Sequence, residues 1–211
     1  MNTIECAARP PDVTACADLR DQFAPYAYLL GIYLGDGCLT LAHGNVWRLR
    51  ISQDASYPKI IEQIEQAITE VASRHPGRIR RQGCFEIYSN WKHWLCVFPQ
   101  HAPGPKHLRA IKLTPWQKEI VAAEPSELIR GLIHSDGCRT INRVTRSWSN
   151  TVRTYEYPRY FFANHSAEIR GLFIETCGQI GVEARHNNRY SVSVARRPSV
   201  EILESIIGMK R

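Results

Sequence analysis

Two segments of this 211-residue chain match each other, and each contains Asp-Gly-Cys near its end. The first segment reads PYAYLLGIYLGDGCLT from residue 25, and the second reads PSELIRGLIHSDGCRT from residue 125. Average composition predicts roughly one chance identity over such a length. The alignment shows more identical pairs than this: Pro25/Pro125, Gly31/Gly131, Asp36/Asp136, Gly37/Gly137, Cys38/Cys138 and Thr40/Thr140. A repeat with a period near half the chain indicates an internal duplication. It predicts a pseudo-dimer in which each half supplies one carboxylate.

Each segment is predicted to form a short helix. Proline suits the first helical position, and apolar residues follow it. The glycine after each aspartate, Gly37 or Gly137, is expected to adopt the left-handed conformation that ends many helices.

Small residues recur at a helical spacing in both segments, at Gly31, Gly35, Gly131 and Ser135. Residues four apart share one helix face, and a glycine inside a helix costs about 1 kcal/mol relative to alanine. Close backbone contact between the two helices would explain this cost. If the helices pack in parallel, their C-terminal ends meet, and Asp36 and Asp136 lie within a few ångströms.

Two carboxylates at the C-terminal ends of helices are electrostatically unfavourable. That end is the negative pole of the helix dipole, and the like charges also repel each other. A bound cation reverses both effects, and carboxylate oxygens are suitable ligands for Mg²⁺. A single Asp-Gly pair is more often a plain turn, but the two matched copies favour a metal site.

The motif residues LLGIYLGDG, from Leu29, and IRGLIHSDG, from Ile129, resemble the LAGLIDADG motif of homing endonucleases. Two copies resemble the single-chain, two-motif type, and the resemblance extends over about residues 24–211. It implies an α+β fold of two pseudo-symmetric αββαββα lobes packed through their motif helices. It also implies that Asp36 and Asp136 bind the catalytic Mg²⁺ or Mn²⁺, and that a monomer acts as a pseudo-dimer on double-stranded DNA.

The order of predicted elements is the same in both halves: helix, hairpin, helix, hairpin, helix. A linker rich in proline and glycine covers residues 99–110. We therefore predict an N-terminal tail at 1–23, a first lobe at 24–110 and a second lobe at 111–211. Within the lobes, we expect Asn90 to cap a short helix and Asn187-Asn188 to form a hairpin turn.

The net charge of +7 and the pI near 9.2 favour a polyanionic partner. Arginines cluster on predicted strands of both halves, and a basic two-stranded ribbon fits the major groove of DNA. The candidate DNA-binding residues are Arg48, Arg50, Arg78, Arg80 and Arg81 in the first half, and Arg139, Arg143, Arg146, Arg153 and Arg159 in the second. Gln53, Asn164, His165, Asn187 and Asn188 are polar side chains that either read bases or form turns.

Seven scattered cysteines without a C-x-x-C pair argue against a zinc knuckle and a disulfide scaffold. The chain has no run of 18 apolar residues, so no membrane span is expected. The start of the chain lacks the basic and apolar regions of a signal peptide. These features lead us to expect a cytoplasmic protein.

The predicted function is metal-dependent cleavage of both DNA strands, with one strand cut beside each aspartate. The family resemblance implies an assisting lysine, and Lys112 and Lys210 match its position best. The accompanying glutamine and arginine have no secure match in this sequence. Three alternatives remain: a DNA-binding regulator without nuclease activity, a hydrolase for another substrate, and an intein. The chain lacks the terminal residues that splicing needs, which argues against an intein.

Overall fold

The computed structural model describes Leu19 and residues 22–148 and 151–208, and most of the predicted tail therefore lies outside the described residues. The first lobe contains α2 (Phe23–Gly35), β1 (Gly37–Ala42), β2 (Val46–Asp54), α3 (Pro58–Ala72), β3 (Gly77–Arg80), β4 (Cys84–Trp91) and α4 (Trp94–Val97). The second lobe contains α5 (Pro115–Ala123), α6 (Pro125–Asp136), β5 (Gly137–Trp148), β6 (Thr151–Ala163), α7 (Ala167–Gln179), β7 (Arg185–Asn188), β8 (Ser191–Val194) and α8 (Arg197–Ile207). None of the described helices is long and apolar enough to cross a membrane.

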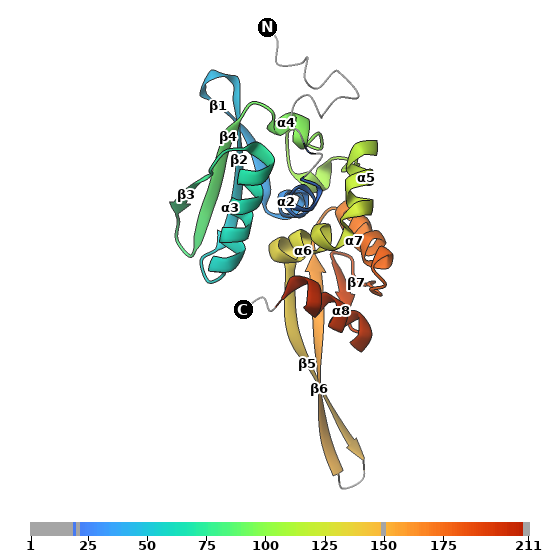
Figure 1. Ribbon diagram of the computed structural model, residues 1–211. Helices are drawn as coiled ribbons and strands as arrows, with labels where there is room; N and C mark the ends of the chain where they lie inside the picture. The colour runs from blue at the N-terminus through green and yellow to red at the C-terminus, as the bar shows by residue number, and fades with distance from the viewer. Residues whose placement is uncertain (1–18, 20–21, 149–150, 209–211) are drawn as a thin grey trace.

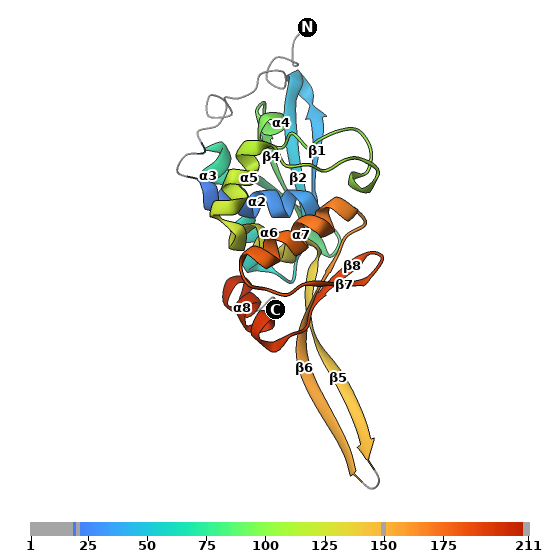
Figure 2. The same cartoon turned by 90° about the vertical axis from the view of Figure 1, so that its right-hand side faces the viewer.

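The two lobes share one sheet topology. Their four-stranded antiparallel sheets have the orders β1-β2-β4-β3 and β5-β6-β8-β7. In Figure 2 the first sheet lies above the paired helices α2 and α6, and the second sheet lies below them. The predicted α+β fold of two related lobes is therefore confirmed.

Helices α2 and α6 form the centre of the molecule, as the small-residue spacing predicts (Figure 1). A Cβ atom added to Gly31 would lie 2.6 Å from the Leu128 carbonyl oxygen and 2.7 Å from the Leu132 nitrogen. A Cβ atom added to Gly131 would lie 3.0 Å from the Gly31 Cα. Gly35 faces the Ser135 side chain in the same way. The backbones of the two helices are therefore in direct contact.

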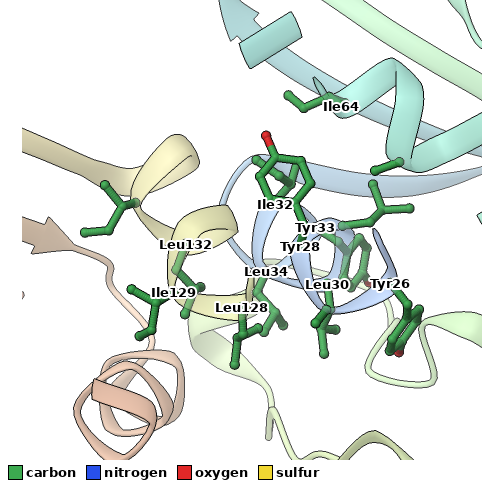
Figure 3. Packing of buried hydrophobic residues seen from close by; sticks show 14 of the residues in the cluster. Tyr26, Tyr28, Leu30, Ile32, Tyr33, Leu34, Ile64, Leu128, Ile129 and Leu132 are labelled. Carbon is green, nitrogen blue, oxygen red and sulfur yellow. The ribbon is translucent and has the colours of Figure 1, made fainter. Parts of the chain in front are cut away.

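Helix α2 is buried on all sides because α3, α5 and α6 pack around it. All nine residues from Tyr26 to Leu34 are buried, which explains the absence of a polar stripe in this segment. Figure 3 shows side chains of α2, of α6 and Ile64 of α3 in one apolar cluster. Helix α3 is amphipathic and buries its isoleucine face against the same cluster.

Three local predictions were wrong. Neither Gly37 nor Gly137 has a positive φ. A Cβ atom would lie 2.6 Å from the Tyr33 Cα if added to Gly37, and 2.6 Å from the Ile133 Cα if added to Gly137. The reason is that each helix runs directly into a strand that folds back over the last turn of the helix.

Asn90 lies in strand β4, where its side chain accepts a hydrogen bond from Arg48. Asn187 and Asn188 end strand β7, and the turn follows at residues 189–190, where the Tyr190 N–H donates to Asn188 Oδ1 at 2.8 Å.

Candidate active site

The aspartates of the two motifs lie at the adjoining ends of α2 and α6. Asp36 follows the last residue of α2, and its N–H donates to the Ile32 carbonyl at 3.0 Å, while Asp136 is the last residue of α6. A Cβ atom on Gly35 would lie 3.1 Å from Asp136 Oδ2, which places that carboxylate against the residue before Asp36. The structure thus brings together the two carboxylates at the negative poles of two helices.

Lys106 lies near both acids, and sequence reasoning did not single it out. It comes from the proline-rich linker, in a short 3₁₀ helix at Lys106–Leu108. Its Nζ donates to the carbonyl oxygens of Leu34 at 3.1 Å and Gly35 at 2.8 Å, and also to that of Tyr33. A cation at these carbonyls offsets the negative end of α2. The available signal in the sequence was a single lysine within a segment of prolines and glycines.

The charge of Lys106 depends on opposing effects. Burial lowers the pKa of the Lys106 ammonium to about 8, whereas the nearby carboxylates of Asp136 and Asp36 favour the charged form and oppose that shift. Both acids therefore act electrostatically on the same ammonium group. At neutral pH Lys106 is mainly a cation, and it can neutralise charge that develops near the acids.

Asn164 holds the second acid. Its Nδ2 donates to Asp136 Oδ2 at 2.6 Å, while its Oδ1 accepts from the Ser166 N–H at 2.8 Å. The first lobe repeats this turn, since Asp54 Oδ1 accepts from the Ser56 N–H at 2.8 Å. In strand register, however, the counterpart of Asn164 is Gln53, because Gly37 lies opposite Ile51 and Gly137 lies opposite Phe162. Gln53 is buried, and its Oε1 has no hydrogen-bond partner within the described residues.

A cavity of about 290 Å³ opens beside Asp136 and Lys106. Two histidines line it, His107 from the linker and His165 after β6, with their ring centroids 5.6 Å apart. The His165 ring also packs against the Tyr190 ring at 4.6 Å. The remaining lining residues are Leu34, Gly35, Ala163 and Asn164. The cavity wall therefore combines two imidazoles and the Lys106 cation, which suit a phosphate group, with the Asp136 carboxylate, which suits a cation.

The two lysines chosen from the sequence do not enter this arrangement. The Lys112 side chain is exposed and is absent from the cavity lining, although its carbonyl accepts a hydrogen bond from Gln100. Lys210 lies outside the described residues. Lys106 precedes Lys112 by six positions in the sequence and is the lysine at the acid pair.

The residues at the acid pair fit a hard divalent cation. Within the described ranges, no group of three His, Cys, Asp or Glu side chains is arranged to hold a metal ion. Two carboxylates nevertheless match Mg²⁺, which keeps several waters and is often held by one or two carboxylates together with substrate phosphates. Asp36 and Asp136 are the residues that would hold such an ion.

Strand register divides the arginines of the first lobe between two faces of the sheet. We call the face turned away from the helices the open face, and in this lobe it carries Cys38, Thr40, Arg48, Arg50, Tyr88 and Asn90. Arg50 donates to Glu86 at 2.7 Å, and Arg81 lies 3.6 Å from the same carboxylate. Arg78 and Arg80 belong to the other face, where Arg78 pairs with Glu65 of α3. The predicted set of five therefore does not form one surface.

The same division holds in the second lobe. Its open face carries Thr140, Asn142, Arg146, Arg153, Tyr155, Tyr157 and Arg159. Arg139 and Arg143 lie on the opposite face, where Arg139 donates to Glu204 of α8 at 2.7 Å and Arg143 pairs with Glu156 at 2.6 Å. Three of the five predicted arginines, Arg146, Arg153 and Arg159, thus share the open face.

The fold resembles LAGLIDADG proteins of known structure. The LAGLIDADG meganuclease I-AabMI bound to uncleaved DNA has a TM-score of 0.55 at 14% identity, covering 86% of this chain and 82% of the meganuclease. The homing endonuclease I-WcaI bound to its DNA recognition sequence has a TM-score of 0.54 at 13% identity, with coverages of 98% and 92%.

The N-terminal LAGLIDADG domain of DUF199/WhiA has a TM-score of 0.57 at 11% identity, with coverages of 99% of this chain and 89% of that domain. No family model matches the sequence, and no curated protein matches it either. The resemblance to LAGLIDADG proteins that the two motifs suggest is thus confirmed at the level of the fold.

Proposed function

We propose that this protein is a DNA endonuclease that depends on Mg²⁺ or Mn²⁺ and cuts both strands of a duplex. The observation that carries the proposal is the acid pair: Asp36 and Asp136 lie at the adjoining ends of two helices, and Lys106 interacts electrostatically with both. Such a concentration of negative charge opposes folding. A bound divalent cation would offset it and would also attract a DNA phosphate. When bound, a divalent cation supplies charge stabilisation and lowers the pKa of water.

The residues of the chain have separate roles in this proposal. Asp36 and Asp136 hold the cation, one beside each scissile phosphate. Asn164 orients the Asp136 carboxylate through the 2.6 Å hydrogen bond. Lys106, in place of Lys112 or Lys210, neutralises negative charge on the reacting phosphate. His107 and His165 donate hydrogen bonds to non-bridging phosphate oxygens in the cavity. The open faces of the two sheets bind the duplex on either side.

The second candidate is a sequence-specific DNA-binding protein without nuclease activity. The observation that favours it is that, among the described residues, no third His, Cys, Asp or Glu side chain joins the two acids to hold a metal ion. The fold itself does not separate the candidates, since it occurs in named endonucleases and in the LAGLIDADG domain of DUF199/WhiA.

A cleavage assay on a random-site DNA library tests the proposal. The duplexes are incubated with the protein and Mg²⁺, Mn²⁺ or EDTA, and both bound and cut molecules are sequenced. We expect a unique cut site in both strands with either metal and none with EDTA. Specific binding without metal-dependent cutting would favour the second candidate, and absence of DNA binding would reject both.

A further inference from the structure

The two lobes carry first hairpins of very different length. Strand β1 has 6 residues and β2 has 9, whereas β5 has 12 and β6 has 13. Figures 1 and 2 both show the β5–β6 ribbon projecting beyond the rest of the molecule. At about 3.4 Å per residue, the extra length of β5 relative to β1 is roughly 20 Å.

The open face of the ribbon is entirely without acidic residues. Its register places Thr140 opposite Arg159, Asn142 opposite Tyr157 and Val144 opposite Tyr155, and then Arg146 opposite Arg153. The one acid of the ribbon, Glu156, lies on the other face and is paired with Arg143. Positive charge on the open face is therefore not neutralised within the ribbon.

The pairing of Arg146 with Arg153 points to a polyanionic partner. Like charges directly across two antiparallel strands destabilise the pair, and both side chains are exposed. The Arg146 guanidinium lies 6.0 Å from the ring of the half-exposed Trp148 on the same face. Tyr155 and Tyr157 stack nearly parallel on this face, and Tyr157 is 49% exposed. A partner with closely spaced negative charges would relieve the repulsion and cover the rings.

We propose that the target DNA is lopsided, with the ribbon binding a flank on the side of the second lobe that has no equivalent on the side of the first lobe. This inference rests on the proposed function, because it extends the DNA path already assigned to the acid pair. Strand β5 begins at Gly137, directly after Asp136, so a duplex at the acid pair continues along the same strand. A two-stranded ribbon also fits the major groove.

The length difference sets the size of the extra flank. Duplex DNA rises about 3.4 Å per base pair, so roughly 20 Å of additional ribbon corresponds to about six base pairs. Arg146 and Arg153 lie in this additional length, beyond the six residues that match β1. They would therefore contact the outer part of the second half-site.

A shortened ribbon provides the test. Residues 143–156 are replaced by Asn-Gly, which leaves six residues in β5 and closes the hairpin at the pair Asn142 and Tyr157. Asn142 and Tyr157 lie an even number of residues from Trp148 and Thr151, the pair that closes the natural hairpin. Every remaining side chain of the ribbon therefore keeps its face. Hydroxyl-radical footprints of both proteins are recorded on the site selected from the library. We expect one end of the footprint to retreat by about six base pairs and the other end to stay.

Single substitutions test the face assignment without shortening the chain. Arg146→Ala and Arg153→Ala are each expected to flatten the slope of log affinity against log salt by about 0.9. Arg143→Ala is the matched control, since Arg143 lies on the same ribbon but is turned to the other face.

The possible failures are distinguishable. Identical footprints of the full-length and shortened proteins, or equal slope changes for Arg143→Ala and Arg146→Ala, would overturn the lopsided target and leave the proposed function intact. Failure to select any DNA with the full-length protein would overturn the proposed function, and this inference with it.

Discussion

The Cα atom of Gly31 lies 3.0 Å from the position that a Cβ atom of Gly131 would occupy, so the two central helices touch through their backbones. The atoms around both glycines are backbone atoms of the partner helix, which cannot rotate away as a side chain can. The approach of these helices decides how close the two acids at their ends lie.

Gly31→Leu and Gly131→Leu are each expected to destabilise the protein by about 1–3 kcal/mol or more, because the added side chain overpacks the helix contact. Thermal or urea unfolding measures this effect. Gly171→Ala is the matched control, since Gly171 lies inside α7 with open space where its Cβ would be. That substitution should stabilise by up to about 1 kcal/mol. An unchanged melting temperature in both leucine variants would show that the helices do not meet at these residues.

Asp36→Asn and Asp136→Asn should each abolish double-strand cleavage, because each removes one carboxylate that holds the cation. DNA affinity should stay within about tenfold, or roughly 1.4 kcal/mol. Cleavage and binding are measured on the same selected duplex, with Glu70→Gln, an exposed carboxylate on α3, as the control. Full cleavage by either asparagine variant would remove that acid from the mechanism.

Lys106 should make the stability of the metal-free protein depend on pH above neutrality. Its folded pKa of about 8 lies below its usual value of 10.5, so between these values the unfolded chain binds the proton and the folded chain does not. The free energy of unfolding therefore rises with pH in this interval. Relative to Lys106→Met, the wild-type protein should gain on the order of 1–3 kcal/mol between about pH 8 and 10.5. Parallel stability curves for the two proteins in EDTA would contradict this prediction.

The wild-type affinity for DNA should fall steeply with salt. A long site implies at least about six phosphate contacts, and hence a slope of about −5 or steeper in log affinity against log salt. Salt-independent binding would argue against a phosphate-bound duplex on these sheets.

Arg139 and Arg159 offer a direct comparison between the two sheet faces. Arg159→Ala, on the open face, should flatten the salt slope by about 0.9. Arg139→Ala should leave the slope unchanged and lower stability by up to about 1 kcal/mol, because it removes the contact with Glu204. Equal slopes for the two variants would show that DNA does not distinguish these faces.

The repeated motif alone was sufficient to predict the centre of the fold. Small residues at a helical spacing have few explanations other than close helix contact, and Gly31 and Gly131 lie at such a contact. The same spacing brought Asp36 and Asp136 to adjoining helix ends. The order of helices and hairpins was also predictable, because each element has its own local pattern of apolar residues.

Only the tertiary structure decided which other side chains join the acids. Lys106 reaches the end of α2 because the linker folds back to it. Such a path leaves no periodic pattern in the sequence, and the sequence therefore favoured Lys112. Gly37 and Gly137 also depend on tertiary structure. A strand folds back over each helix end and leaves no room for a Cβ atom, whereas neither glycine has a positive φ.

The ten candidate arginines show the same limit of sequence reasoning. Composition and clustering indicated a basic surface, but side chains alternate between the two faces of a strand, and a shift by one residue exchanges the faces. Strand pairing therefore determined that Arg146, Arg153 and Arg159 share the open face, while Arg139 and Arg143 pair with acids on the other. The sequence by itself determined the duplicated helices and their acids, because those depend on local spacing. The lysine at the acids and the faces of the arginines depended on contacts between distant parts of the chain.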